Sequence, residues 1–279
     1  METLPVGRRP IAPLARRGIA AVLLAADIRN GSIAVGLRKA GERWTARFRL
    51  SAAERSVDEW EFLIASLLAS RGADRAGIGH AVLSSVVPSA TVPFAQAMSR
   101  FPRGGKDPLI VGPGVKTGLR IRTDNPAEVG SDLVCAAVAA VALLGAPCIV
   151  VDFGTTLTFT AVDAKGDLVG VALAPGMESA ALALRRGAAQ LPQIRLEAPL
   201  RAIGKNTAES VRAGLMIGWS GLVDRILDRM IEELGGAGVS LVGTGDHTDP
   251  PLTPRLGFDL WEPFLALDGL ALIHERRTE

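Results

Sequence analysis

The sequence predicts an α/β fold built from two similar lobes. The main observation is an internal repeat, in which residues 27–42 align without gaps with residues 152–167 and match Asp27 to Asp152 and Gly41 to Gly166. In each copy an apolar strand ends at the aspartate, and the chain turns through small or polar residues before returning as a second strand. The chain has 279 residues, 48% of them hydrophobic, and at this size a single core tends to divide in two.

Strands and helices are expected in the same order in both copies. Apolar or alternating residues predict first strands at 21–26 and 148–151, and third strands at 43–50 and 168–174. Apolar residues three and four apart predict helices at 57–70, 128–144, 177–186, 207–234 and 265–277. The proline-rich stretch 249–263 is expected to be a loop. Each strand triplet is therefore followed by helices, which is the plan of a ribonuclease H-like lobe.

This duplicated plan resembles the actin, hexokinase and Hsp70 superfamily. The resemblance implies a nucleotide in a cleft between the lobes, with the aspartate turn of each lobe gripping the polyphosphate. A single Asp-containing turn is more commonly just a turn, but two copies in register favour the phosphate-binding interpretation. We expect a disordered basic extension over residues 1–17, an N-terminal lobe over 18–112 and a C-terminal lobe over 113–279.

Composition indicates a small-molecule partner. With 31 Lys and Arg against 29 Asp and Glu, the net charge of +2 gives no footprint for nucleic acid or an anionic membrane. Cys135 and Cys148 form no CxxC pair, so neither a disulfide framework nor a zinc site is indicated. The apolar run 18–26 after four arginines is similar to a signal peptide, yet it continues without a break into Asp27, which favours a buried strand and a cytoplasmic protein.

The middle of the chain carries a more specific series of motifs. They are Gly-Pro-Gly-Val-Lys-Thr-Gly-Leu at 112–119, Asp-Asn-Pro at 124–126, Glu-Val-Gly-Ser-Asp at 128–132, Asp-Phe-Gly-Thr at 152–155, Ala-Pro-Gly at 174–176 and Ile-Gly-Lys-Asn-Thr at 203–207. Together with the strand end Ser-Ser-Val-Val-Pro at 84–88, their order and spacing resemble the type III pantothenate kinases, from about Leu23 to Arg276. The resemblance implies phosphorylation of the primary hydroxyl of pantothenate by ATP, the first committed step towards coenzyme A.

The resemblance also implies roles for individual residues. Asp132 matches the proton acceptor, Asp27 lies towards Mg²⁺ directly or through water, and Asp152 matches the ligand of a monovalent cation, K⁺ or NH₄⁺. Nucleotide contacts fall on Asp27, Asn30, Gly31, Ser32, Gly154, Thr155, Gly243 and Gly245. Substrate contacts fall on Thr123, Gly130, Ser131, Asp132, Leu133 and Thr207, the last in a site built at the interface of a homodimer. Without the surrounding motif, Asp132 would be only an early-helix residue favoured by the helix dipole.

Four places depart from the family's pattern, and each falls where chemistry is expected. In the first turn Arg29 replaces a glycine and Gly31 replaces a hydroxyl residue. Leu133 replaces an arginine, a bidentate anchor for substrate. Thr123 replaces a tyrosine, in a chain that has none, and Asp246 replaces the second glycine of an adenosine loop. The Arg29 guanidinium could contact phosphate, pair with Asp27 or fill the pocket, and the sequence leaves these alternatives open.

Clustering of these departures in the expected cleft leaves three explanations open. The site is retuned for another hydroxylated substrate, or catalysis has lapsed while the fold and dimer persist, or compensating residues preserve the ordinary activity. The leading hypothesis is an ATP-dependent kinase of the pantothenate type with weak or altered substrate preference, as in a divergent paralogue. The alternative is an impaired member that binds a ligand or protein partner without turnover.

Overall fold

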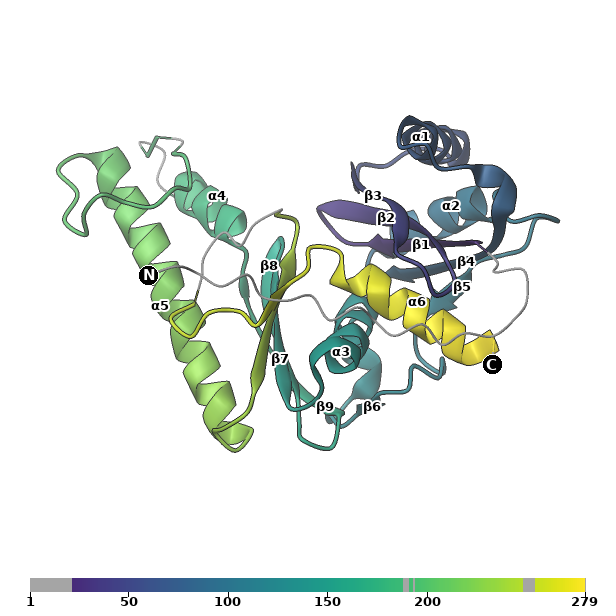
Figure 1. The fold of residues 1–279 in the computed structure, drawn as a ribbon. Coiled ribbons are helices and arrows are strands. Elements are labelled where there is room, and N and C mark those ends of the chain that lie inside the picture. The colour runs from purple at the N-terminus through teal and green to yellow at the C-terminus, as the bar shows by residue number, and fades with distance from the viewer. Residues whose placement is uncertain (1–21, 188–190, 193, 248–253, 279) are drawn as a thin grey trace. The chain divides into compact units, whose positions relative to one another are not determined.

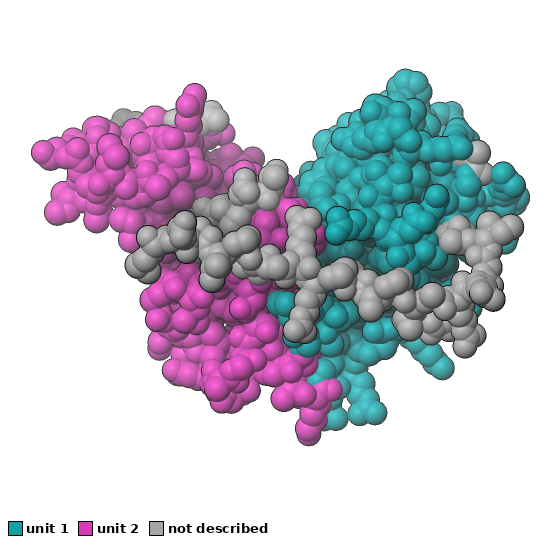
Figure 2. All heavy atoms as spheres, viewed as in Figure 1, with its two compact units in different colours: residues 1–145, 166–168, 264–279 teal, residues 146–165, 169–263 magenta. Residues whose placement is uncertain are grey.

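The computed structural model describes residues 22–187, 191–192, 194–247 and 254–278. Contacts between Cα atoms divide the chain into two compact units, which Figure 2 shows in different colours. Unit 1 comprises residues 1–145, 166–168 and 264–279, and unit 2 comprises residues 146–165 and 169–263. The predicted extension over residues 1–17 lies outside the described residues.

Unit 1 contains a five-stranded sheet in the order β3-β2-β1-β4-β5. Its strands are β1 (Val22–Ile28), β2 (Ser32–Lys39), β3 (Trp44–Ser51), β4 (Ile78–Ser85) and β5 (Leu109–Val111). The first three pair antiparallel, whereas β4 pairs parallel with both β1 and β5. The helices are α1 (Val57–Ser70), α2 (Pro88–Ser99), α3 (Ser131–Leu144) and α6 (Leu265–Thr278), and a short strand β6 (Arg120–Ile121) follows β5 (Figure 1).

Strand β1 is buried on both faces, and its alternation assigns each side chain to one of two cores. Leu24 and Ile28 belong to the core that α1 and α2 cover, with Trp60 and Phe94 packed edge to face at 5.1 Å between ring centroids. Leu23 and its neighbours two residues apart face the other core, to which α3 and α6 contribute. The face that carries Asp27 is therefore the face covered by α3 and α6.

Helices α3 and α6 approach each other closely in unit 1. A Cβ atom built on Gly269 of α6 would lie 2.5 Å from the carbonyl carbon of Cys135 in α3 and 2.9 Å from its Cα, inside the normal contact distance of 3.5–4.0 Å for carbon atoms. Only glycine allows this backbone-to-backbone contact, which fixes the position of α3 against the sheet.

Unit 2 repeats the topology of unit 1. Its strands are β7 (Cys148–Phe153), β8 (Thr156–Val162), β9 (Asp167–Pro175), β10 (Ser240–Gly245) and β11 (Leu260–Trp261), in the order β11-β10-β7-β8-β9, and the first residues of β9 also pair with β6. The antiparallel hairpin β7–β8 and the parallel neighbour β10 correspond to β1, β2 and β4. The helices are α4 (Met177–Gly187) and α5 (Thr207–Glu233). The predicted duplication of an α/β unit is confirmed.

The core of unit 2 lies between its sheet and α5. Phe153 and Phe159 of the hairpin pack with Trp219 of α5, and Phe258 and Trp261 pack against this cluster. Trp219 is buried, as expected for a core residue rather than a ligand platform. None of the helices in the described part of the chain combines the length and apolarity needed to cross a bilayer.

Two predicted boundaries are corrected by the structure. The helix expected from residue 128 begins at Ser131, because Pro126–Glu128 forms a separate 3₁₀ turn. The loop expected over 249–263 contains strand β11, while residues 248–253 lie outside the described chain. The predicted lobe boundary between residues 112 and 113 stays a prediction about domains, whereas the contact-based units part at Gly145 and place α6 in unit 1.

Candidate functional site

Asp27 stands near the end of β1, where the parallel neighbour β4 also ends. Its side chain is buried, and each carboxylate oxygen has a partner: the Ser84 hydroxyl donates to Oδ1 at 2.5 Å, and Arg29 Nε donates to Oδ2 at 2.6 Å. A buried carboxylate is stable only when it is paired and hydrogen-bonded, so these two donors explain how Asp27 is tolerated. Of the three alternatives for Arg29, the structure selects pairing with Asp27.

The turn after β1 is tight. The Arg29 amide donates to the Ser32 carbonyl at 2.9 Å, and Asn30 and Gly31 between them are exposed. The predicted phosphate-binding residues of this turn are therefore accessible, while the arginine side chain folds back towards the strand it follows.

Asp132 lies in the first turn of α3, the position expected from its sequence context. Its Oδ1 accepts a hydrogen bond from the Leu133 amide at 2.9 Å, and its Oδ2 lies 4.0 Å from Arg29 Nε. Positive charge at a helix N-terminus favours the ionised carboxylate there. The structure thus brings Asp27, Arg29 and Asp132 together within unit 1.

The start of α3 is held against the end of β4. The Ser131 hydroxyl accepts from the Ser85 amide at 3.2 Å and donates to the Ser85 carbonyl at 3.3 Å. A Cβ on Gly130 would lie 2.5 Å from Asp132 Oδ1 and 3.3 Å from Val86, so glycine is needed where the chain enters the helix. These contacts set the direction of the Asp132 carboxylate.

A pocket of about 990 Å³ opens beside this helix start. Its walls come from the segment 111–121, the turn 125–130 and the ends of β4 and α3. Gly130 and Ser131 belong to the lining, and Lys116 and Arg120 contribute cationic groups to it. A pocket with apolar walls and a few convergent polar groups is the usual form of a small-molecule site.

Thr123 and Leu133 differ in how they meet the expectation of substrate contact. The Thr123 hydroxyl is buried without a hydrogen-bond partner among the described residues, so it has an unused donor and acceptor. Leu133 is half-buried in the first turn of α3 and offers no polar group to a ligand. Neither residue lines the 990 Å³ pocket.

Cys135 lies one turn further along α3 and is fully buried. Burial raises its pKa well above the usual value for a thiol, and the neighbouring charges of Asp27 and Asp132 act in the same direction. The thiol is therefore protonated and adds no charge beneath the carboxylates.

In unit 2 the second aspartate turn has a different surrounding. Asp152 of β7 is buried and lies in register with Thr158 of β8 and Thr244 of β10, so all three side chains lie on one face of the sheet. The hydroxyls of Thr158, Thr160 and Thr244 are buried without hydrogen-bond partners among the described residues. Unpaired buried hydroxyls beside a carboxylate are unusual in a core and are typical of a ligand site.

The predicted glycines of unit 2 have distinct local reasons. A Cβ on Gly243 would overlap the Trp261 ring, so this glycine makes room for packing between β10 and β11. Gly245 has φ of +139°, a conformation that side-chain-bearing residues rarely adopt, and the next amide, of Asp246, donates to the Phe153 carbonyl at 3.2 Å. The carbonyls of Gly154 and Thr155 approach Gly176 closely, and the Ser179 hydroxyl donates to the Thr155 carbonyl at 2.8 Å.

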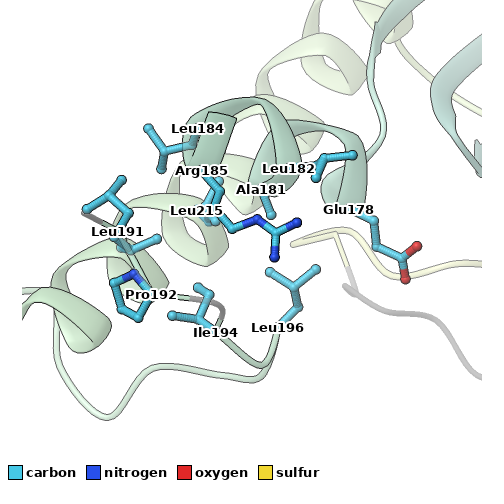
Figure 3. A pocket seen from close by; sticks show the side chains of 11 residues that line it. Glu178, Ala181, Leu182, Leu184, Arg185, Leu191, Pro192, Ile194, Leu196 and Leu215 are labelled. Atoms are coloured by element: carbon cyan, nitrogen blue, oxygen red, sulfur yellow. The ribbon is translucent and has the colours of Figure 1, made fainter. Parts of the chain in front are cut away.

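Thr207 begins α5, directly after the N-cap Asn206, whose side chain accepts from the Glu209 amide. A second hollow, of about 230 Å³, lies nearby between α4, residues 191–196 and α5 (Figure 3). Its wall is mainly leucine, isoleucine and proline, and it contains none of the predicted site residues. We therefore place the chemistry in unit 1 at the 990 Å³ pocket and treat this hollow separately.

Sequence reasoning missed part of this site. Ser84 was noted only as part of a motif, and its hydrogen bond to Asp27 depends on the β1–β4 register. The hydroxyls of Thr158 and Thr160 are evident only from the burial of the β8 face. In the described residues no group of three or more His, Cys, Asp or Glu side chains is arranged to hold a metal ion.

Comparisons with known proteins give consistent results. A sequence model of the family described as "Type III pantothenate kinase" matches residues 23–229. A type III pantothenate kinase of Moorella thermoacetica is 40% identical over 259 residues, covering 92% of this chain and all of the relative. One of Thermobifida fusca is 39% identical over 264 residues, with the same coverage of both chains.

Among solved structures, the ROK hexokinase of Thermus thermophilus superposes with a TM-score of 0.50 at 13% identity, covering 92% of this chain and all of that one. At this identity the likeness bears on the fold alone. It agrees with the predicted class of duplicated ribonuclease H-like units found in the hexokinase, actin and Hsp70 superfamily.

Proposed function

The chain belongs to the type III pantothenate kinase family, and on that premise we propose that it transfers the γ-phosphoryl group of ATP to the primary hydroxyl of pantothenate, in coenzyme A biosynthesis. The observation that carries the proposal is the match over most of the chain to relatives of this name, joined to a carboxylate at the start of α3 beside a pocket of small-molecule size. The comparisons lend no support to the alternative of a member that binds without turnover.

Asp132 is the group we assign to the substrate hydroxyl. Phosphoryl transfer needs a positioned oxygen nucleophile and an acceptor for its proton. The Asp132 carboxylate is oriented by the Leu133 amide and by the Ser131–Ser85 contacts, and it lies at the mouth of the helix whose first residues line the pocket. The hydroxyl of pantothenate donates its proton to Asp132 as the oxygen attacks the phosphorus, and the bond to the leaving ADP oxygen breaks.

The substrate is expected to lie along Gly130 and Ser131, with its carboxylate towards the cations Lys116 and Arg120 of the same pocket. Because Leu133 lacks the guanidinium that the family pattern has here, one bidentate anchor is missing. Loss of one charged contact costs about 1.5–3 kcal/mol, or roughly tenfold to a hundredfold in affinity. We propose Thr123 as a further contact, because its unpaired hydroxyl is satisfied only by a ligand or water.

The nucleotide is assigned to the two aspartate turns and the loop after β10. In unit 1 the exposed turn of Asn30, Gly31 and Ser32 offers backbone amides to phosphate, and in unit 2 Thr155 and Gly245 occupy the corresponding loops. Gly154 is assigned with Thr155, whereas Gly243 acts through packing. Asp246 places a carboxylate next to Gly245, which weakens contact with an anion and favours the sugar or base of the nucleotide.

The residues present differ in how well they fit the metal ions that the family implies. Mg²⁺ requires oxygen ligands at about 2.0–2.1 Å in octahedral geometry, but both oxygens of Asp27 are hydrogen-bonded and one holds a guanidinium that would repel a second cation. Asp27 as arranged does not fit direct ligation of Mg²⁺, so no step is assigned through that ion.

Asp152 fits a monovalent cation better. The hydroxyls of Thr158, Thr160 and Thr244 are buried without partners among the described residues, and neutral oxygen donors beside one carboxylate suit K⁺ or NH₄⁺. When bound, such an ion supplies positive charge towards the phosphates. The protein's own part is to hold the carboxylate and hydroxyls on one face of the β7–β8–β10 sheet.

The remaining assignments follow from the resemblance. We propose a cytoplasmic homodimer in which Thr207 contributes a substrate contact, with neither nucleic acid nor a membrane as partner, because the net charge of +2 gives no electrostatic footprint for either. We also propose two domains that close on a nucleotide, as the duplicated topology favours.

The experiment is a coupled turnover assay with product identification. Purified protein with MgATP, KCl and pantothenate should yield phosphopantothenate by mass spectrometry, and omission of either substrate should abolish the product. A panel of other hydroxylated acids and amides tests whether the site is retuned. Turnover of another panel member in place of pantothenate would correct the substrate, and no turnover with any member would remove the proposal.

A further inference from the structure

Arg29 lies between the two carboxylates of unit 1. Its Nε is 2.6 Å from Asp27 Oδ2 and 4.0 Å from Asp132 Oδ2. The side chains of Arg29 and Asp132 are 12% and 14% exposed, and that of Asp27 is 1% exposed. A largely enclosed cation thus approaches both acidic groups that the proposed function uses.

The local charge explains why a cation is required at this place. The Ser84 hydroxyl satisfies one oxygen of Asp27 but brings no charge, so a buried carboxylate without Arg29 would stay uncompensated. A divalent cation bound to the same carboxylate would serve equally well in a protein that lacked the arginine. In this chain the guanidinium already occupies the Oδ2 side of Asp27.

A guanidinium and a divalent cation exclude each other at this oxygen. They would compete for the same lone pairs and repel each other at close range. Within the described ranges, no cluster of three acidic, His or Cys side chains offers an alternative place for a metal. The guanidinium is permanently charged and presents several donors, a geometry suited to phosphate oxygens.

We propose that Arg29 is a positioning residue that replaces a divalent cation at Asp27 and meets the polyphosphate of the nucleotide with its guanidinium. The inference rests on the proposed function, since it assumes that the turn after β1 faces ATP. It deepens that function by giving the chain an affinity for nucleotide that depends on an internal cation, and a divalent-ion requirement that does not include ligation by Asp27.

The test is calorimetric titration of ATP, with and without Mg²⁺, in the intact protein. In EDTA, Arg29→Ala should weaken ATP binding roughly tenfold to a hundredfold, the range for one charged contact, while Arg29→Lys retains most of the affinity. Arg43→Ala is the matched control, because it removes an exposed arginine from the β2–β3 connection of the same unit and should change nothing. Unchanged affinity of Arg29→Ala for metal-free ATP would overturn the inference.

A second measurement guards against misfolding of Arg29→Ala, which leaves Asp27 unpaired. Titration with Mn²⁺ alone, followed by electron paramagnetic resonance, should show stronger binding to Arg29→Ala than to the unmodified protein. The double variant Asp27→Asn with Arg29→Ala carries no uncompensated charge and should lose this gain while still lacking the metal-free affinity for ATP. Equal Mn²⁺ binding by all three proteins would count against the inference.

These outcomes separate the inference from the proposed function. An unmodified protein that phosphorylates pantothenate, but whose metal-free ATP affinity is indifferent to Arg29, refutes only the role of the arginine. An unmodified protein that binds no ATP with or without Mg²⁺ refutes both.

Discussion

Gly269→Ala should destabilise the protein although alanine is the better helix former. On helix propensity alone the change would stabilise α6 by about 1 kcal/mol. The new Cβ would instead lie 2.5 Å from the carbonyl carbon of Cys135 and 2.9 Å from its Cα. These are backbone atoms, so no side-chain rotation relieves the overlap, and α3 and α6 must separate by about 1 Å to restore normal contact.

Overpacking of this kind costs typically about 1–3 kcal/mol and occasionally more. Because the overlap involves only backbone, we place the cost at the upper end, so the net loss after the propensity gain is about 2 kcal/mol. Asp132 lies one turn before Cys135 on α3, and a displacement of about 1 Å at a catalytic group costs up to roughly a hundredfold in rate. The variant should therefore lose both stability and kcat.

Urea unfolding followed by circular dichroism measures the first effect, and the turnover assay measures the second. Ser66→Ala is the control, because it makes a similar propensity gain of about 0.5 kcal/mol at an exposed position of α1 in the same unit. Stabilisation by Gly269→Ala, equal to or above that of the control, would refute the close packing of α3 on α6 and the link from this packing to Asp132.

Two further predictions concern titratable groups. Both thiols should resist a thiol reagent at pH 8 in the folded protein and react fully in denaturant, because burial raises the pKa of Cys148 to about 12 and that of Cys135 still more strongly; rapid labelling without unfolding would contradict this. Burial, with the neighbouring His80, lowers the pKa of His274 from 6.5 to about 4, so the unfolded state binds more protons between these values and stability should fall as the pH drops from about 6.5 to about 4. His274→Gln should flatten this dependence of the urea midpoint, and parallel curves for the two proteins would refute it.

Much of the fold was predictable because the hydrophobic pattern is strong and repeated. The helices over 57–70, 177–186 and 207–234 agree with the structure to within one residue at each end. Helix α2 was not predicted, since its sequence contains Pro93 and β-branched residues that obscure the helical period. Strand β11 is only two residues long and lies in a proline-rich stretch, where local pattern carries little information.

The site was predictable in its residue types but not in its contacts. The repeat and the motifs indicated Asp27 and Asp132, and the structure places them beside each other in unit 1. The choice that Arg29 makes among its alternatives depends on the burial of Asp27, which no sequence pattern gives. The partnerless threonine hydroxyls near Asp152 likewise arise from sheet register, because residues far apart in the chain share one face.

The role of Asp132 is the centre of this account, and its replacement by asparagine tests it most directly. The amide keeps the size of the side chain and the Leu133 contact but cannot accept the proton of the substrate hydroxyl. Single-turnover measurements should show phosphorylation of pantothenate slowed at least about a hundredfold, the usual scale for loss of a general base, with pantothenate affinity nearly unchanged. A variant that transfers phosphoryl at the rate of the unmodified protein would contradict the account.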